Sequence, residues 1–409
     1  MTPTPSLPRM SLRFLARLTS SHGLVNSFNC DNNVIKGLIP SGLLQDGSRP
    51  SFEAVSILTE RHVLASKCEE IIRGIRETAS QAVDMSLSES QLLSCARFFS
   101  PRNVELFLTM FFQIWYPNWP VFHRQTFNPT LKPPRLIAAL SLIGATLSPE
   151  RKHRDQAMAW LETVENWIFR CPDFNEDMVP QTDDDNQDSQ VRQRLDILQA
   201  AYAVVLLMNW EGDKKARLRA RRKRFPDIVY VARSLYPFAM PGTSEAKLLA
   251  PCSLYDDWKA FALREELIRT LLYTFLLDCA FVMFYDMSPR MKINELEFGL
   301  AATNEHFNAS NAEAWFASVQ AAENRTVAYS QVTLSQSIRI IMTEDFSATQ
   351  WEILEQTNPL NLFAITSGKL YGKIKQQVLI NSFQPFIILS FTTRMDQTKD
   401  LDLYPSHEG

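Results

Sequence analysis

The chain has 409 residues, of which 45% are hydrophobic and 21% are charged. This composition predicts a globular protein and excludes a disordered low-complexity one. Only 12 residues are glycine, well below the average share of about 7%, which disfavours folds built on tight turns and phosphate-binding loops. The net charge of −3 excludes a global positive field that would draw the whole protein onto nucleic acid or anionic lipid.

Apolar residues at spacings of three and four predict helices throughout residues 51–345. Ser88 with Gln91 forms a capping-box signature, and Ser100–Pro101 and Pro133–Pro134 are typical helix starts. The predicted helices cover, in chain order, residues 51–79, a segment after 88, 104–116, 134–147, 151–170, 191–210 and 258–285. The fold is therefore expected to be all-α, a multi-helix globular domain with irregular, weakly structured ends.

The helix over residues 258–285 is the longest of these and carries charge in an apolar setting. Glu265 and Arg269 are spaced to pair at i and i+4. Asp278 interrupts an apolar stretch, where a charge costs several kcal/mol unless it is paired. We expect Asp278 to have a partner or to lie at the exposed edge of the helix, in a structural role.

Two further regions differ from this pattern. Residues 171–190 hold seven acids and two prolines and predict an exposed loop, which lacks the glycine and spacing of an EF-hand calcium site. In the final segment, 346–409, the helical pattern weakens, although 351–362 and 368–380 are each compatible with a helix.

The six cysteines are widely scattered, with no C-x-x-C pair and no histidine at finger spacing. A zinc site needs clustered thiolates or imidazoles, so no metal site is encoded and the thiols are expected to be buried in a reducing compartment. The best apolar run, 271–283, contains Asp278, so no membrane span is expected.

The strongest local charge feature is the run KKARLRARRKR, with eight cations in eleven residues. Three interpretations stay open: a nuclear-import signal, a patch that contacts nucleic-acid phosphates, and a plain solvated helix face. The cations are Lys214, Lys215, Arg217, Arg219, Arg221, Arg222, Lys223 and Arg224.

His123 and Arg124 supply a base and an anion clamp, which on their own suggest catalysis. No further catalytic motif accompanies them, because the chain has no G-x-S-x-G, H-E-x-x-H or G-x-G-x-x-G pattern and no P-loop. We therefore predict that the protein is not an enzyme.

An ordered series of motifs points to a family. The segment WYPNWPVFHRQTF contains Trp115, Trp119, His123, Arg124 and Phe127 and precedes the apolar helix LIAALSLIGA. Far downstream lies a helix with four further motif residues, Trp258, Glu265, Arg269 and Asp278. Over about residues 10–345 this series resembles the regulatory middle homology domain of fungal zinc-finger transcription factors.

The resemblance implies a helical regulatory domain over 51–345, preceded by a post-finger linker at 1–50 and followed by a diverged segment at 346–409. It also implies a nuclear regulator of RNA polymerase II genes, such as a specialised-metabolite cluster. The expected partners are DNA, bound directly or through another regulator, a second subunit of the same or another kind, and a small-molecule effector, but no membrane. Family members bind zinc through a finger that is absent here, so no cofactor is encoded.

Two alternatives stay open: a finger-less module that modulates other transcription factors, and an unrelated helical enzyme or small-molecule binder. A polar cluster converging in a deep pocket would favour the last. For the regulator we expect an aromatic-rich core around Trp115, Trp119, Trp210 and Trp258, with a groove for an effector or partner.

Overall fold

The computed structural model describes residues 61–81, 87–174, 187–241, 254–322, 332–343 and 357–372. Within these ranges the regular structure is helical, apart from one antiparallel bridge between Gly299 and Thr333. The all-α prediction is confirmed for this part of the chain. The 1–50 segment, the centre of the acidic loop and residues after 372 lie outside the described residues.

The helices form a body around a large shared core. The longer ones are, in chain order, α2 (Arg61–Ser80), α3 (Glu89–Phe98), α4 (Pro101–Met110), α5 (Pro134–Thr146), α6 (Arg151–Phe169), α7 (Gln187–Trp210), α9 (Phe225–Leu235), α10 (Leu254–Tyr285), α12 (Ala312–Ala322) and α13 (Leu334–Met342). The short ones are the 3-10 turns η4 (Tyr116–Asn118), η5 (Pro172–Phe174), η8 (Tyr236–Ala239) and η10 (Ile293–Glu295), the α-helices α8 (Lys214–Arg219) and α11 (Asn304–Phe307), and the π-helices η3 (Phe111–Trp115) and η7 (Ala220–Arg224).

Several helix starts follow the local chemistry of the sequence. Ser88 accepts the backbone N–H of Gln91 at 3.3 Å, while the Gln91 side chain accepts the Ser88 N–H at 2.8 Å, so the predicted capping box is confirmed. α4 and α5 begin at prolines, whose missing N–H costs nothing in the first turn of a helix. The Ser100 hydroxyl makes no capping hydrogen bond, so Pro101 alone marks the start of α4.

The helix predicted at 104–116 is not a regular α-helix. It is α-helical only to Met110, continues as the π-helix η3 and tightens into the 3-10 turn η4. Pro117 lacks an N–H and cannot continue an α-helical ladder, which explains why the regular helix is lost here. The aromatic motif after it is therefore held by irregular backbone.

Two other predicted boundaries also move. α7 begins at Gln187, so the last residues of the expected acidic loop are helical, and Asp188 in the first turn complements the helix dipole. Near the C-terminus, residues 359–372 form one continuous helix where the sequence indicated two. Leu360, Ala364 and Ile365 of this helix are buried in the main core.

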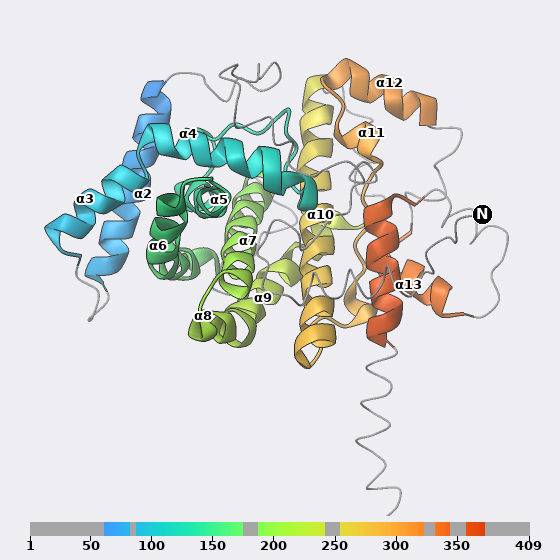
Figure 1. Cartoon of the computed structure of the whole chain (residues 1–409). Coiled ribbons are helices and arrows are strands. Elements are labelled where there is room, and N and C mark those ends of the chain that lie inside the picture. Colours follow the sequence, from blue (N-terminus) through green and yellow to red (C-terminus); the bar gives the residue numbers. More distant parts are fainter. Residues whose placement is uncertain are drawn as a thin grey trace, which may run out of the picture.

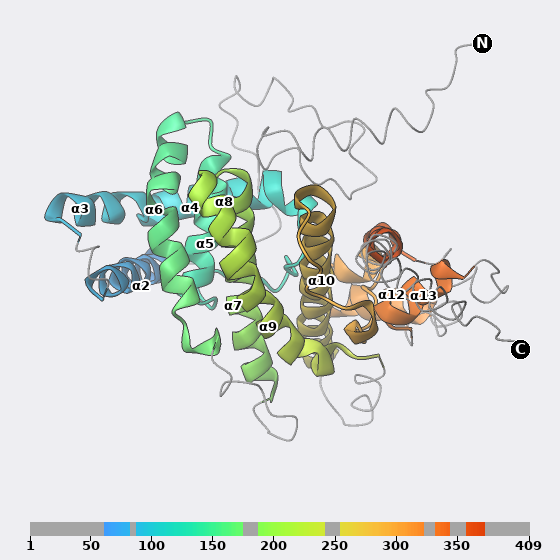
Figure 2. The same ribbon diagram turned by 90° about the horizontal axis from the view of Figure 1, so that it is seen from below.

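α10 lies between two groups of helices. Figure 1 shows α2 to α9 on one side, and α11 to α13 with the helix over 359–372 on the other; Figure 2 shows the same order after rotation. By length and composition α10 resembles a membrane-crossing helix, but 89% of its apolar window is buried inside the protein. It is the central helix of the fold, as the sequence predicted, and direct contacts such as Gln125 with Asn308 and Arg233 with Glu295 also join the two groups.

Candidate functional site

Glu265 and Arg269 of α10 form the pair predicted from their spacing. Arg269 Nε donates to Glu265 Oε1 at 2.8 Å, and both side chains are at most 3% exposed. Glu265 also accepts the Ala302 N–H at 2.9 and 3.0 Å, and Arg269 donates to the Pro120 and Ala302 carbonyls at 3.4 and 3.2 Å. This buried pair therefore joins the aromatic motif to the segment after η10.

Glu266, the next residue of α10, is fully buried and holds the His-Arg motif. One carboxylate oxygen accepts the backbone N–H of His123 at 2.8 Å, and the other accepts a short hydrogen bond from Arg192 of α7. Burial opposes ionisation of Glu266, but Arg192, Lys132 and the His123 amide together hold its pKa below the usual value. Lys132 also pairs with Asp196 of α7 at 2.7 Å, so the network is charge-balanced.

The His123 side chain is enclosed rather than presented to a substrate. It is 0% exposed, its Nδ1 lies 2.9 Å from the Thr126 hydroxyl, and its ring packs edge-on against Trp258 at 5.2 Å and Phe307 at 5.3 Å. Burial lowers the pKa of His123 to about 4, although Glu266 opposes the shift. A neutral, enclosed imidazole suits a structural role better than general base catalysis.

The neighbouring motif residues pack on aromatic rings. The Arg124 guanidinium lies over Tyr116 at 5.4 Å, and Phe127 packs against Phe112 at 4.9 Å. Trp119 is 1% exposed and stacks on Tyr202 of α7 at 5.0 Å. The motif thus anchors the irregular segment after η3 to α7 and α10.

The tryptophans do not share one cluster as expected. Trp115, Trp119 and Trp210 belong to the main core, whereas Trp258 packs with Trp315 in a separate small cluster at the N-terminal end of α10. A cavity between η3, η4, α7 and α10 has room for about one water molecule. It is lined by Trp115, Asn118, Trp119, Tyr202, Leu206 and Tyr273. This cavity is too small for an effector, and the groove expected for an effector or partner stays a prediction.

Asp278 has the partner that its apolar surroundings required. Its Oδ2 accepts the backbone N–H groups of Arg290 at 3.0 Å and Met291 at 2.8 Å, and the Tyr371 hydroxyl at 2.9 Å. Burial raises the pKa of Asp278 above its usual value, although these hydrogen bonds oppose the shift. Asp278 therefore fixes the helix over 359–372 to the central helix.

The basic run has an inward-facing half. Glu165 of α6 is 0% exposed and accepts hydrogen bonds from Arg219 at 2.6 to 3.0 Å and from Arg224 at 2.7 Å. Arg221 donates to Asn209 at 2.8 Å and lies 3.6 Å from the Tyr285 ring centroid. Arg217 donates to the Gly212 carbonyl at 2.8 Å. These four arginines hold α8 and η7 against the body.

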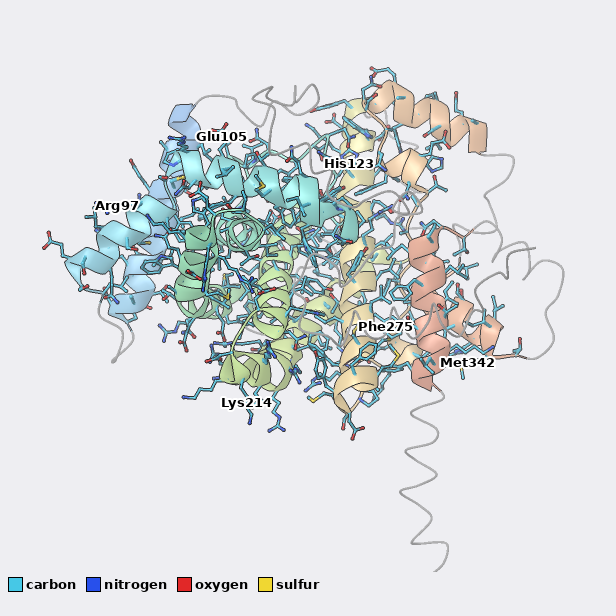
Figure 3. The ribbon with its side chains drawn as sticks, viewed as in Figure 1. Arg97, Glu105, His123, Lys214, Phe275 and Met342 are labelled. Atoms are coloured by element: carbon cyan, nitrogen blue, oxygen red, sulfur yellow. The ribbon has the colours of Figure 1, made fainter. Side chains whose placement is uncertain are left out.

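The remaining four cations of the run face solvent: Lys214, Lys215, Arg222 and Lys223. Lys214 lies at the outer edge of the helical body, with its side chain directed away from it (Figure 3). Leu218 lies between them in sequence and is 39% exposed.

Sequence reasoning missed three partners of these networks. Glu165 lies among the apolar positions of α6, the same signal that singled out Asp278, and could have been found that way. Glu266 follows Glu265 directly, but nothing local indicates its pairing with a residue 143 positions earlier. Tyr371 lies in the weakly patterned final segment and has no local signal either.

The described residues contain no group of three or more His, Cys, Asp or Glu side chains placed to hold a metal ion. Cys68, Cys95, Cys171 and Cys279 are free and buried, as expected, whereas Cys30 and Cys252 lie outside the described residues. Burial raises the pKa of the Cys68 and Cys95 thiols to about 12, so neither is suited to bind a metal as thiolate.

The helical body carries the domain of a transcription factor family. The fungal specific transcription factor domain matches residues 108–348, more than half of the chain, and the chain belongs to this family. Two relatives are similar to it in sequence. Transcription factor verF of Penicillium polonicum is 31% identical over 92% of this chain and 56% of that protein. Zinc finger protein zas1 of Schizosaccharomyces pombe is 22% identical over 56% of this chain and 24% of that protein.

The chain thus spans about half the length of the Penicillium relative and about a quarter of the Schizosaccharomyces one. No solved structure matches it significantly.

Proposed function

We propose that this chain is a nuclear regulator of RNA polymerase II transcription, acting on a specialised-metabolite gene cluster through its helical domain. The family match and the similarity to a protein named as a transcription factor support the regulator. The structural observation that carries the proposal is that Glu265, Glu266 and Arg269 use their charges to hold distant segments together. Such a network suits a scaffold that binds partners better than a catalytic centre.

The mechanism that we propose is a shift between two packings of this body. α10 holds the aromatic motif and α7 through the Glu266 carboxylate, and the helix over 359–372 through Asp278, so exchanging one set of contacts would reposition a whole segment. An effector, a partner regulator or a second copy would change activity only by its difference in affinity for the two packings. The cavity lined by Trp115, Trp119 and Tyr202 holds about one water molecule in this packing, so an effector that enters it would favour a packing in which the cavity is larger.

DNA can be reached in two ways within this proposal. The chain reads DNA with its own surface, or it acts as a finger-less module on a partner that carries a zinc finger. The run 214–224 is a candidate import signal when it unwinds from the body, and a candidate phosphate contact in its folded state.

A tethering experiment tests the proposal directly. The full chain is fused to a heterologous DNA-binding domain in fungal cells that carry a reporter with its sites, and the DNA-binding domain alone is the control. We expect the fusion to raise or lower the reporter by several-fold. An unchanged reporter, with the fusion present in the nucleus at the level of the control, would contradict the regulator.

Chromatin mapping of a tagged chain at its native level separates the remaining candidates. Discrete peaks that share a motif support a chromatin-bound regulator, and peaks over a metabolite gene cluster support that target class. Nuclear protein without peaks supports the finger-less module. Exclusion from the nucleus contradicts both and favours the helical enzyme or small-molecule binder.

A further inference from the structure

The basic run forms part of a folded helix with two distinct faces. Its inner arginines contact Glu165, Asn209, Tyr285 and backbone carbonyls, as described above. Its exposed residues form what we call the outer basic surface: Lys214, Lys215, Leu218, Arg222 and Lys223. A ligand of the folded protein meets mainly this surface, because Arg217, Arg219 and Arg221 are only partly exposed.

The inner face does not neutralise the positive charge of the run. Glu165 supplies one carboxylate to two arginines, Arg219 and Arg224, and the exposed Glu162 approaches Arg219 at 3.4 Å, so these acids pair with only part of the run. Arg221 is held by an amide and an aromatic ring, which bring no negative charge. Burial, together with the nearby charges of Arg217 and Arg222, lowers the pKa of Arg221, which is consistent with a cluster of like charges. The local potential is therefore positive although the chain carries a net charge of −3.

The folded geometry restricts the kind of ligand. A partner protein that binds the run as an extended peptide in its own groove would need residues 214–224 to unwind. Unwinding breaks the hydrogen bonds to Glu165 and exposes Phe225, which is 0% exposed in the fold. A polyanion with regularly spaced charges needs no unwinding. Lys215 and Arg222 are separated by about 10 Å along a helix axis at a rise of about 1.5 Å per residue, a span over which duplex DNA carries several phosphates.

We propose that the outer basic surface binds the phosphate backbone of a nucleic-acid duplex without reading its sequence. The four cations contact phosphates, and Leu218 packs against the apolar part of a sugar. This inference rests on the proposed function, because it assigns the DNA contact of the regulator to named residues. Two further cations, Arg151 and Lys152, are exposed at the start of α6 and extend the surface. The start of α6 lies next to the run because Arg154 pairs at 2.5 Å with Glu211, which precedes the run by three residues.

The test is a binding titration of the purified full chain with a fluorescent 20-base-pair duplex at several salt concentrations. Each phosphate contact contributes about −0.9 to the slope of log affinity against log salt, so four contacts predict a slope of about −3.6 and a roughly 100-fold loss of affinity between 50 and 200 mM salt. Two unrelated duplex sequences should bind with equal affinity.

The variant K214Q/K215Q/R222Q/K223Q removes the four cations and spares the inner arginines. A matched control removes four exposed cations from α2, α3 and the first turn of α4: Arg73, Arg76, Arg97 and Arg102, each to Gln. Both variants change the net charge equally, and both are expected to keep the thermal midpoint of the wild type. We expect the first variant to lose more than about tenfold in affinity at 50 mM salt and most of the slope, and the control to bind like the wild type.

Three results would overturn the inference: no duplex binding at 50 mM salt, equal loss in the two variants, or tighter binding of polyglutamate than of the duplex, which would assign the surface to an acidic peptide. The tethering experiment supplies its own DNA-binding domain and does not depend on this surface. A positive reporter with no duplex binding therefore rejects this inference alone, whereas an unchanged reporter rejects the proposed function.

Discussion

Replacing Glu165 with alanine tests whether one buried carboxylate holds the basic run in place. The side chain is 0% exposed and accepts hydrogen bonds from Arg219 and Arg224, which are 27% and 11% exposed. Removing one partner of a buried ion pair costs about 3–5 kcal/mol, because the other partner stays buried without compensation. Arg219 can turn toward solvent but Arg224 cannot, so we expect a loss near the lower limit, about 3 kcal/mol.

The expected readout is a thermal midpoint lowered by roughly 5 °C, since unfolding residues 51–345 at about 2.1 cal/mol/K per residue gives an unfolding entropy of about 0.6 kcal/mol/K. Glu162 is a matched control, because it lies three residues before Glu165 on α6 and approaches the same Arg219 at 3.4 Å, but its side chain is 62% exposed. Glu162→Ala should cost less than about 1 kcal/mol, as surface ion pairs do. The two variants, measured by thermal and urea unfolding, differ mainly in burial.

A double-mutant cycle identifies the cause. If Glu165→Ala destabilises by leaving Arg224 uncompensated, adding Arg224→Ala should add much less than its own single effect, with a coupling of at least about 1 kcal/mol. Equal losses for Glu165→Ala and Glu162→Ala, or additive effects in the cycle, would refute the idea that this pair anchors η7.

Three further changes test other parts of the structure. Gly144→Ala would place a Cβ 1.8 Å from the Phe107 carbonyl oxygen, so α4 and α5 must separate; we expect a loss of about 1–3 kcal/mol or more in urea unfolding. Burial lowers the pKa of His123 to about 4, so it is neutral in the fold, whereas His123 of the unfolded chain takes up a proton near pH 6.5. The free energy of unfolding should therefore fall as the pH drops from about 6.5 to 5, by up to about 1.4 kcal/mol per pH unit. The variant His123→Gln should remove this contribution to the slope. Tyr371→Phe deletes a hydroxyl that donates to the buried Asp278, so hydrogen exchange should quicken in 359–372 with a global cost of about 1–3 kcal/mol, and unchanged exchange would contradict the anchoring role.

The sequence by itself determined the elements whose causes are local. The Ser88–Gln91 capping box, the prolines that start α4 and α5, and the i,i+4 pair of Glu265 with Arg269 all involve residues within one helical turn. Apolar periodicity likewise located α6, α7 and α10 to within a few residues, because a helix face is set by the chain's own repeat. The need of Asp278 for a partner followed from its apolar neighbours alone.

Only the tertiary structure decided which groups meet. Glu266 binds the His123 amide across 143 residues, Glu165 binds Arg219 across 54, and Asp278 binds Tyr371 across 93. No periodicity encodes such pairs, since they depend on how the helices pack around α10. The same packing divides the stretch of eight cations into four that contact the body and four that face solvent. The reason is that every charge on the buried side of a helix must be paired or enclosed, whereas charges on the other side stay hydrated.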